Sequence, residues 1–241
     1  EFPELLPDFL ERYGNASPLP MEEGGVDNTT VMGLLMFNVL PIVQVQEIAA
    51  LAEANGTTVT CPEIQGDFPN EGLPSEDIIV IGNGCTDEMR VQYDGSFVYN
   101  ADGVRYSDFA ISTPNDACPN TYDVIGYNGG FDMSLGLYET DIESVLFFDN
   151  VSVDETMCTE NPVAYQYHMT STIETADGDV QIINGHADVL LPIGTIDYKF
   201  SIDTIEQVMD STICETEPAS GENVMSNGQD EARFTFDGAT D

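Results

Sequence analysis

The spacing of apolar residues changes near Thr57 and divides the chain into two kinds of pattern. Before it, the segment from Val31 to Ala54 carries long apolar runs and predicts a helix, which Asn55-Gly56 would end. Pro41 would kink this helix or split it in two. Its most apolar part, Val31 to Val43, fits a helix buried under a sheet. The alternative is an apolar surface that meets a partner chain or lipid.

Residues 1–30 contain four prolines and predict an irregular segment, in which Glu4 to Tyr13 could form a short helix. After Thr57, short runs rich in Val, Ile, Tyr and Phe alternate with polar residues. Asx-Gly pairs, which favour tight hairpins, separate these runs. The sequence therefore predicts a mainly β fold: an antiparallel sheet or sandwich of hairpins over residues 57–241. Residues 1–56 precede it, with one apolar helical segment at about 31–54.

Three shorter patterns refine this picture. The run 90–99, with Asp94-Gly95 at its centre, predicts a hairpin of its own. The run 144–153 predicts a strand buried on both faces near Phe147 and Phe148. Residues 215–228 have the composition of a loop, and a last strand is expected within 232–238.

The most regular alternation lies at 163–205 and predicts a three-stranded antiparallel meander with one apolar and one polar face. The apolar residues change parity between Ile182 and Ala187, so we expect a β-bulge at Asn184-Gly185. Eight residues are expected on the buried face: Tyr165, Tyr167, Met169, Ala187, Val189, Ile196, Tyr198 and Phe200.

The polar face of this meander gathers both histidines of the chain. Pairing Met169 with Ala187 sets His168 against Asp188 and His186 against Thr170. Pairing Val189 with Ile196 would set Asp188 against Asp197 and His186 against Lys199. A solvated sheet face explains this grouping. The sharper alternative is a transition-metal site of His168, His186, Asp188 and Asp197, against which the Lys199 ammonium argues.

Charge narrows the choice of partners. The chain has 44 Asp and Glu against 5 Lys and Arg, a net charge of −39. Such a surface repels phosphate backbones and anionic membranes, so we expect no nucleic-acid partner. The longest apolar run is also too short to span a membrane. High solubility explains the charge; the alternative is calcium capture, with oxygen ligands from the acidic turns 100–103 and 176–179. No other cofactor is expected.

Five cysteines point to an oxidising compartment. None forms a C-x-x-C pair and the chain has two His, so a structural zinc site has no support. Sequence order favours the disulfides Cys61–Cys85 and Cys118–Cys158, with Cys214 unpaired within the chain, although four cysteines allow three connectivities. The start at Glu1 fits processing during export, and the natural chain is expected to continue past Asp241. Glycosylation sequons, relevant if the host glycosylates, occur at Asn15, Asn28, Asn55 and Asn150.

Two stretches carry a resemblance to other proteins. The first begins with CPEIQGDF and continues through IIVIGNGCTDEMRVQYDGSFVYNADGVRYSDFAIS; the second is CETEPASGENV followed by ARFTFDGATD. Together they cover roughly residues 57–110 and 205–241, and they resemble uncharacterised, acidic, exported lipoprotein-type proteins of myxobacteria and related bacteria. The resemblance implies export and a β-rich fold, and it implies no catalytic activity.

No nucleophile elbow, P-loop or dinucleotide-binding motif occurs in the chain, and so many carboxylates make any single acidic pair uninformative. We therefore expect an exported structural or interaction protein of the cell surface, which joins other protein chains or copies of itself in a surface assembly or filament. The alternative is an extracellular module that binds lipid, glycan or calcium. An enzyme is the third choice.

Overall fold

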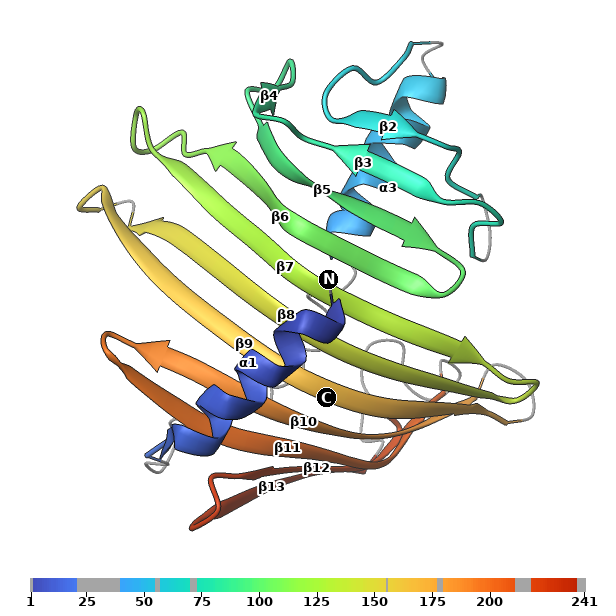
Figure 1. Ribbon diagram of the computed structural model, residues 1–241, viewed down its shortest axis with the longest axis vertical. Coiled ribbons are helices and arrows are strands. Elements are labelled where there is room, and N and C mark those ends of the chain that lie inside the picture. The colour runs from blue at the N-terminus through green and yellow to red at the C-terminus, as the bar shows by residue number, and fades with distance from the viewer. Residues whose placement is uncertain are drawn as a thin grey trace. The chain divides into compact units, whose positions relative to one another are not determined.

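The protein is mainly β. The computed structural model describes residues 2–20, 40–54, 57–69, 73–154, 156–176, 180–210 and 218–237. Strand accounts for 60% of the structure and helix for 13%, which confirms the predicted fold class. The described strands all join one hydrogen-bonded sheet, so of the two predicted arrangements the chain adopts the sheet (Figure 1).

The elements follow one another in a simple order. The helices are α1 (Phe2–Asn15) and α3 (Leu40–Ala54). The strands are β1 (Ser17–Pro18), β2 (Glu63–Gln65), β3 (Ile78–Ile81), β4 (Cys85–Thr86), β5 (Gln92–Asn100), β6 (Gly103–Pro114), β7 (Tyr122–Leu135), β8 (Glu139–Asp154), β9 (Thr159–Thr175), β10 (Gln181–Ile193), β11 (Ile196–Met209), β12 (Ser220–Ser226) and β13 (Glu231–Phe236).

Neighbours in the sheet are mostly neighbours in sequence. The order is β13-β12-β11-β10-β9-β8-β7-β6-β5-β3-β2; β4 also pairs with β5, and the short β1 pairs in parallel with β11. The sheet is therefore an extended meander, as the recurring turn signals predict. Neither described helix is long and apolar enough to cross a membrane.

The chain forms two compact units. The first comprises Glu1–Leu5, Met36–Phe131 and Leu146–Tyr165, and the second comprises Leu6–Leu35, Asp132–Val145 and Gln166–Asp241. Four of the division points fall inside α1, β7, β8 and β9, and none falls at residue 56. The change of apolar spacing near residue 57 therefore marks a change from helix to strand. It does not mark a boundary between the two compact units.

A ladder of aromatic rings holds the first unit together. Phe109 packs edge-on against Phe97 at 5.0 Å between ring centroids, and Phe97 meets Tyr106 at 5.6 Å. The series continues through Tyr127, Phe148 and Tyr165 at spacings of 5.3, 5.4 and 6.2 Å. Five adjacent strands, β5 to β9, supply these rings, and such pairs contribute beyond their buried area. In the middle of β8, Val145 and Leu146 are both fully buried, so the predicted double burial lies just before Phe147 and Phe148.

The second unit contains the predicted meander, β9 to β11. Met169 pairs with Ala187 and Tyr167 with Val189, as the alternation predicts. Five of the eight expected core residues are buried: Tyr167, Met169, Ala187, Val189 and Phe200. Tyr165 and Tyr198 are half-buried, and Ile196 is 47% exposed because it begins a strand just after a turn.

The prediction of a bulge at Asn184-Gly185 is wrong, and the extra residue of the bulge lies in β11, the neighbouring strand. Between the pairs Ile183–Gln207 and Gly185–Thr204, β10 advances by two residues and β11 by three. Glu206 takes a positive φ of 45° there. Against β9, β10 keeps one unbroken register from Gln181 to Leu190. The parity change has a simpler cause: Ile183 lies on the same face as Ala187, and Ile182 lies on the opposite face.

The predicted register between β10 and β11 is wrong by four residues. Val189 pairs with Phe200 rather than with Ile196, because the turn between the strands is only Gly194-Thr195. Pro192 continues the strand as the partner of Asp197. Asp188 therefore faces Ser201, and neither the Asp188–Asp197 pair nor the His186–Lys199 pair forms.

Two other local predictions also fail. Asp94-Gly95 does not turn the chain, because β5 runs straight through it, and the extra residue of the bulge lies in β6, where Asp108 has a positive φ of 47°. Residues 220–226, expected as loop, form β12, whereas the last strand agrees with β13. Both errors have one origin: Gly95 and Gly221 each lie opposite a bulge in the neighbouring strand, and a Gly next to a polar residue occurs there as well as in a turn.

The helices differ from the prediction in position. Residues 1–30 were expected to be largely irregular, yet α1 spans Phe2–Asn15 with Pro7 inside it. The described part of the predicted 31–54 helix is α3, which begins at Leu40. Pro41 therefore stands in its first turn, where proline is tolerated, and does not kink it. Residues 31–39 and Asn55-Gly56 lie outside the described residues.

Replacing Gly95 by Ala tests the β5–β6 bulge. Gly95 has a φ of 62°, and an added Cβ would lie 2.1 Å from the carbonyl oxygen of Asp108. Gly194 has the same φ of 62° with nothing within 4 Å, so Gly194→Ala serves as the matched control. We expect Gly194→Ala to lose about 1–2 kcal/mol of unfolding free energy in urea. Gly95→Ala should lose about 1–3 kcal/mol more. Equal losses would contradict the close approach.

Candidate functional site

The polar face of β9 to β11 carries the residues that sequence reasoning singled out. His168 pairs with Asp188, as predicted, and His186 pairs with Thr170. Asp197 and Lys199 lie on the same face of β11. The structure thus gathers the predicted residues on one face, but it divides them among four sets of contacts.

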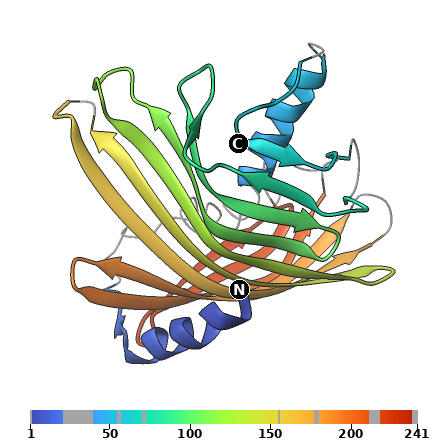
Figure 2. The same ribbon diagram turned by 45° about the horizontal axis from the view of Figure 1, so that its top comes forward.

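Helix α1 lies against this face, which sequence reasoning expected to be solvated (Figure 1, Figure 2). Phe9 is fully buried, and its ring meets the His168 ring edge-on at 6.3 Å between centroids. Leu190, the β10 partner of Gln166 and Lys199, is also fully buried although it belongs to the polar face. The face is therefore a docking surface for the chain's own N-terminal helix.

Arg12 joins α1 to two strands. Its Nε and Nη2 donate to the two carboxylate oxygens of Asp197 at 3.1 and 3.0 Å, and its Nη1 donates to Gln166 Oε1 at 2.7 Å. The two-point geometry fixes the helix orientation as well as its position. Both charged side chains are about one-third exposed, at 32% and 29%. Water therefore screens the pair, and it contributes about 1 kcal/mol at most.

Tyr13 and Lys199 form the second set of contacts between α1 and the sheet. Lys199 Nζ donates to the Tyr13 carbonyl oxygen at 3.0 Å and lies 5.2 Å from the centroid of the Tyr13 ring. The Tyr13 hydroxyl donates to the Phe200 carbonyl oxygen at 3.4 Å. Burial, followed by the nearby Asp188 carboxylate, raises the pKa of Tyr13 well above its ordinary value. Tyr13 therefore stays neutral, and the only lysine of the chain has a structural role.

His168 and His186 do not share a site. His168 Nε2 lies 3.1 Å from Glu143 Oε1. His186 Nδ1 lies 2.6 Å from Asp203 Oδ1, and its Nε2 lies 3.3 Å from Asp188 Oδ1. Burial opposes protonation of His186, but the hydrogen bonds and charges of Asp203 and Asp188 outweigh it and raise its pKa. An imidazolium at this position is held by two carboxylates, which is the opposite of a neutral metal ligand.

The predicted metal candidates therefore do not converge. His168 is held by Glu143, His186 by Asp203 and Asp188, and Asp197 by Arg12. In the part of the chain that the structure describes, no group of three or more His, Cys, Asp or Glu is arranged to hold a metal ion. Of the two acidic turns, 100–103 closes the β5–β6 hairpin, with Asn100 Oδ1 accepting from the Asp102 amide at 3.0 Å. Residues 177–179 lie outside the described residues.

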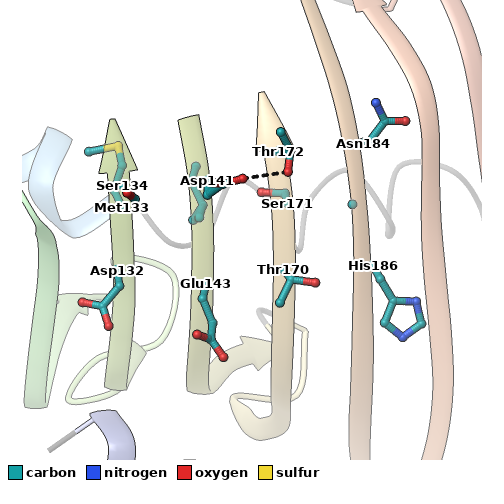
Figure 3. A pocket seen from close by; sticks show the side chains of 12 residues that line it. Asp132, Met133, Ser134, Asp141, Glu143, Thr170, Ser171, Thr172, Asn184 and His186 are labelled. Carbon is teal, nitrogen blue, oxygen red and sulfur yellow. Dashed lines mark hydrogen bonds between the residues drawn. The ribbon is translucent and has the colours of Figure 1, made fainter. Parts of the chain in front are cut away.

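An open groove of about 560 Å³, whose lining includes acidic and hydroxyl side chains, extends from His186 towards β7. Figure 3 shows Asp132, Glu143, Thr170 and His186 side by side on β7, β8, β9 and β10. Asp141 accepts a hydrogen bond from the Thr172 hydroxyl at 2.9 Å in the same groove. Carboxylates and hydroxyls of this kind can bind a hydrated cation or sugar hydroxyls.

Both predicted disulfides are present. Cys61 bonds Cys85 with a Cα–Cα distance of 5.7 Å, and Cys118 bonds Cys158 at 5.5 Å. They fit an oxidising environment. Cys214, predicted to be unpaired, lies outside the described residues, as do the sequon residues Asn28 and Asn55. Asn15 ends α1, where its side-chain amide donates to the Glu11 carbonyl oxygen at 2.9 Å, and Asn150 lies in β8.

Strand β13 forms one end of the strand order. Among the described strands it pairs with β12 alone, in an unbroken antiparallel register from Glu231–Ser226 to Phe236–Gly221. Arg233 donates to Glu222 Oε2 at 2.6 Å and to Glu231 Oε1 at 2.7 Å. No described strand pairs with the other side of β13, where a further strand would bond to the backbone N–H and C=O groups.

Sequence reasoning missed the residues that organise this face from a distance. Phe9, Arg12 and Tyr13 reach β9 to β11 across more than 150 positions, and Glu143 and Asp203 complete the environments of the two histidines. The available signal was the amphipathic spacing of Phe9 and Tyr13, four residues apart on one helix face. That spacing predicts a buried helix face but not the surface that buries it.

Comparison of the chain with protein-family models, with curated proteins and with solved structures finds no match.

Phe9→Ala tests the docking of α1. Truncating this fully buried ring should cost about 3–5 kcal/mol of unfolding free energy in urea, as for other buried Phe residues. Leu10→Ala, at the next position with 48% of its side chain exposed, is the matched control and should change stability by about 0.5 kcal/mol or less. Similar losses from the two changes would show that α1 does not bury Phe9 in solution.

The His186 environment predicts a pH dependence. Because Asp203 and Asp188 raise the pKa of His186 in the folded state, protonation stabilises the fold. This contribution is complete below the unfolded pKa of about 6.5 and is lost as pH rises through the folded value. We expect NMR titration to place the His186 pKa above 6.5, and Asp203→Asn to lower it. An unchanged His186 titration in Asp203→Asn would contradict this assignment.

Proposed function

We propose that this chain is an exported interaction protein of the cell surface, which joins another copy of itself by pairing strands at the β13 edge. The observation that carries the proposal is the contrast between the two ends of the strand order. An unpaired strand edge is a template for another strand unless features of the sequence block it.

The β2 end is protected. This strand has three residues, and it lies next to Cys61, which is bonded to Cys85. A strand of three residues offers few free backbone groups to a partner.

The β13 end has no such protection. It has six residues, contains no Pro or Lys, and keeps a regular register with β12. Ala232, Phe234 and Phe236 are half-buried on one face, whereas Glu231, Arg233 and Thr235 are exposed on the other. Its alternation therefore matches that of an inner strand, which normally has neighbours on both sides.

Register supports a second copy as the partner, and charge sets the condition for pairing. A two-fold antiparallel pair centred on Phe234 overlaps residues 232–236 of both copies and sets Ala232 opposite Phe236 on the same half-buried face. The net charge of −39 opposes association of copies over longer distances. Salt screens this repulsion, so pairing should be favoured at high ionic strength.

Export is supported by the two disulfides and by the acidic surface. Disulfides persist in oxidising compartments, and a high net charge keeps an extracellular protein soluble until it reaches its partner.

Proline substitutions in β13 test the proposal. Of two adjacent residues, one directs its N–H towards β12 and the other directs it away from the sheet. One of the variants Phe234→Pro and Thr235→Pro therefore removes an N–H that bonds to β12, and the other removes an N–H at the outer edge. The variant that removes only the outer N–H should keep near-native thermal stability, which identifies it as the edge-blocking variant. We expect the unmodified protein to be monomeric at low salt and dimeric at high salt in sedimentation velocity, and that variant to stay monomeric at both.

Two results would overturn the proposal. One is the absence of dimers at every salt concentration, and the other is undiminished dimer formation by the edge-blocking variant. A dimer that forms at low salt and dissociates at high salt would contradict the role given to charge.

A further inference from the structure

A cleft of about 230 Å³ opens between β8, β9, β10 and β11 within the second unit. Its apolar walls come from Ile142, Met169, Ile173, Ile183, Ala187 and Ile202. Met169, Ala187 and Ile202 are paired across three strands, on the face opposite to His168 and Asp188. The cleft thus lies on the face of β9 to β11 that α1 does not cover.

The register explains why the sheet is hollow at this point. Gly185 pairs with Ser171 on one side and with Thr204 on the other, so one row of the sheet holds two short side chains and a glycine. Aliphatic or thioether side chains flank this row, with Ile183 and Ile173 paired before it and Ala187, Met169 and Ile202 after it. Filling the row is constrained at its centre, because a Cβ on Gly185 would lie 3.1 Å from the Thr170 carbonyl oxygen and from Ser171 Cβ.

Water is a poor occupant of this cleft. Its polar lining comes from Ser171, His186 and Thr204. The Thr204 hydroxyl already donates to Asn223 Oδ1 at 3.2 Å, and the His186 ring lies on the opposite face of the sheet, held by Asp203 and Asp188. An ordered water needs two to four polar partners, and an apolar cavity of about 150 Å³ stays dry and takes up a ligand such as benzene. A space of 230 Å³ with these walls suits an alkyl chain or a small ring, and is smaller than pockets for drug-sized ligands, which begin at about 300 Å³.

Charge selects among apolar ligands. The net charge of −39 gives the surroundings a negative potential, which disfavours a fatty-acid carboxylate or a phosphorylated headgroup. An uncharged headgroup meets no such penalty.

We propose that this cleft binds one alkyl chain of an uncharged amphiphile, with the chain lying over Gly185 between the two rows of aliphatic side chains. The site is independent of pairing at β13, which uses backbone groups of another strand. It makes the protein a carrier or sensor of a neutral single-chain lipid.

Fluorescence of N-phenyl-1-naphthylamine, a neutral apolar probe, tests this site directly on the whole chain. The absence of tryptophan leaves little protein emission to interfere. We expect saturable binding of one probe per chain and displacement by 1-decanol. Decanoate at alkaline pH should compete roughly tenfold less well at low salt, and the difference should shrink at high salt because screening weakens the repulsion.

Ser171→Leu fills the cleft and should weaken probe binding by at least about tenfold, since the new side chain takes the ligand's place. Thr170→Leu adds the same side chain to the exposed, opposite face of the same strand and should leave binding unchanged. Far-UV circular dichroism and thermal unfolding establish that each variant is folded. If Ser171→Leu is not folded, Ala187→Val fills the cleft from β10 with a smaller increase in volume.

Several outcomes would overturn the inference. They are the absence of saturable binding by the unmodified protein, equal binding by the folded cleft-filling variant, or equal loss in Thr170→Leu. Decanoate and 1-decanol competing equally at low salt would overturn the selection for an uncharged headgroup.

Discussion

The alternation of side chains across the pleat of β9 to β11 is the constraint on which the second unit depends. Val189 and Leu190 are consecutive residues, and both are almost completely buried. Because neighbouring residues of a strand face opposite ways, both faces of the sheet must be covered at this point. On one face α1 provides the cover through Phe9, Arg12 and Tyr13. On the other, the same alternation brings Ser171, Gly185 and Thr204 into one row and leaves a cleft.

The few cations of the chain occupy structural positions. Arg12 and Lys199 connect α1 to the sheet, and Arg233 connects β12 to β13 through Glu222. Arg105 donates to the carbonyl oxygens of Val104 and Phe131, which belong to different strands. Each of these contacts joins elements that carboxylates alone could only push apart. The 44 acidic residues already give the chain the net charge that keeps it soluble. These basic residues therefore serve to hold helices and strands together.

Sequence reasoning succeeded where the signal was local or repeated. The alternation in 163–203 was enough to pair His168 with Asp188, and cysteine order was enough for both disulfides. It failed where one residue has two structural meanings. Asp94-Gly95 marks a bulge and not a turn, Pro192 continues a strand, and the bulge in β11 falls at Glu206, a residue with no preference for positive φ. The docking of α1 and the cleft both depend on contacts between distant segments, which no local pattern contains.

The meander topology has a consequence for the order in which the protein folds. From β5 to β13, each strand pairs with the strand that precedes it, so pairing requires only the closure of short loops and can proceed as the chain emerges. Helix α1 is the exception, because Arg12 and Asp197 are separated by 185 positions. Helix α1 is synthesised before the sheet and therefore has no surface to bind until β11 is in place. Docking of α1 can therefore occur only after most of the sheet has formed.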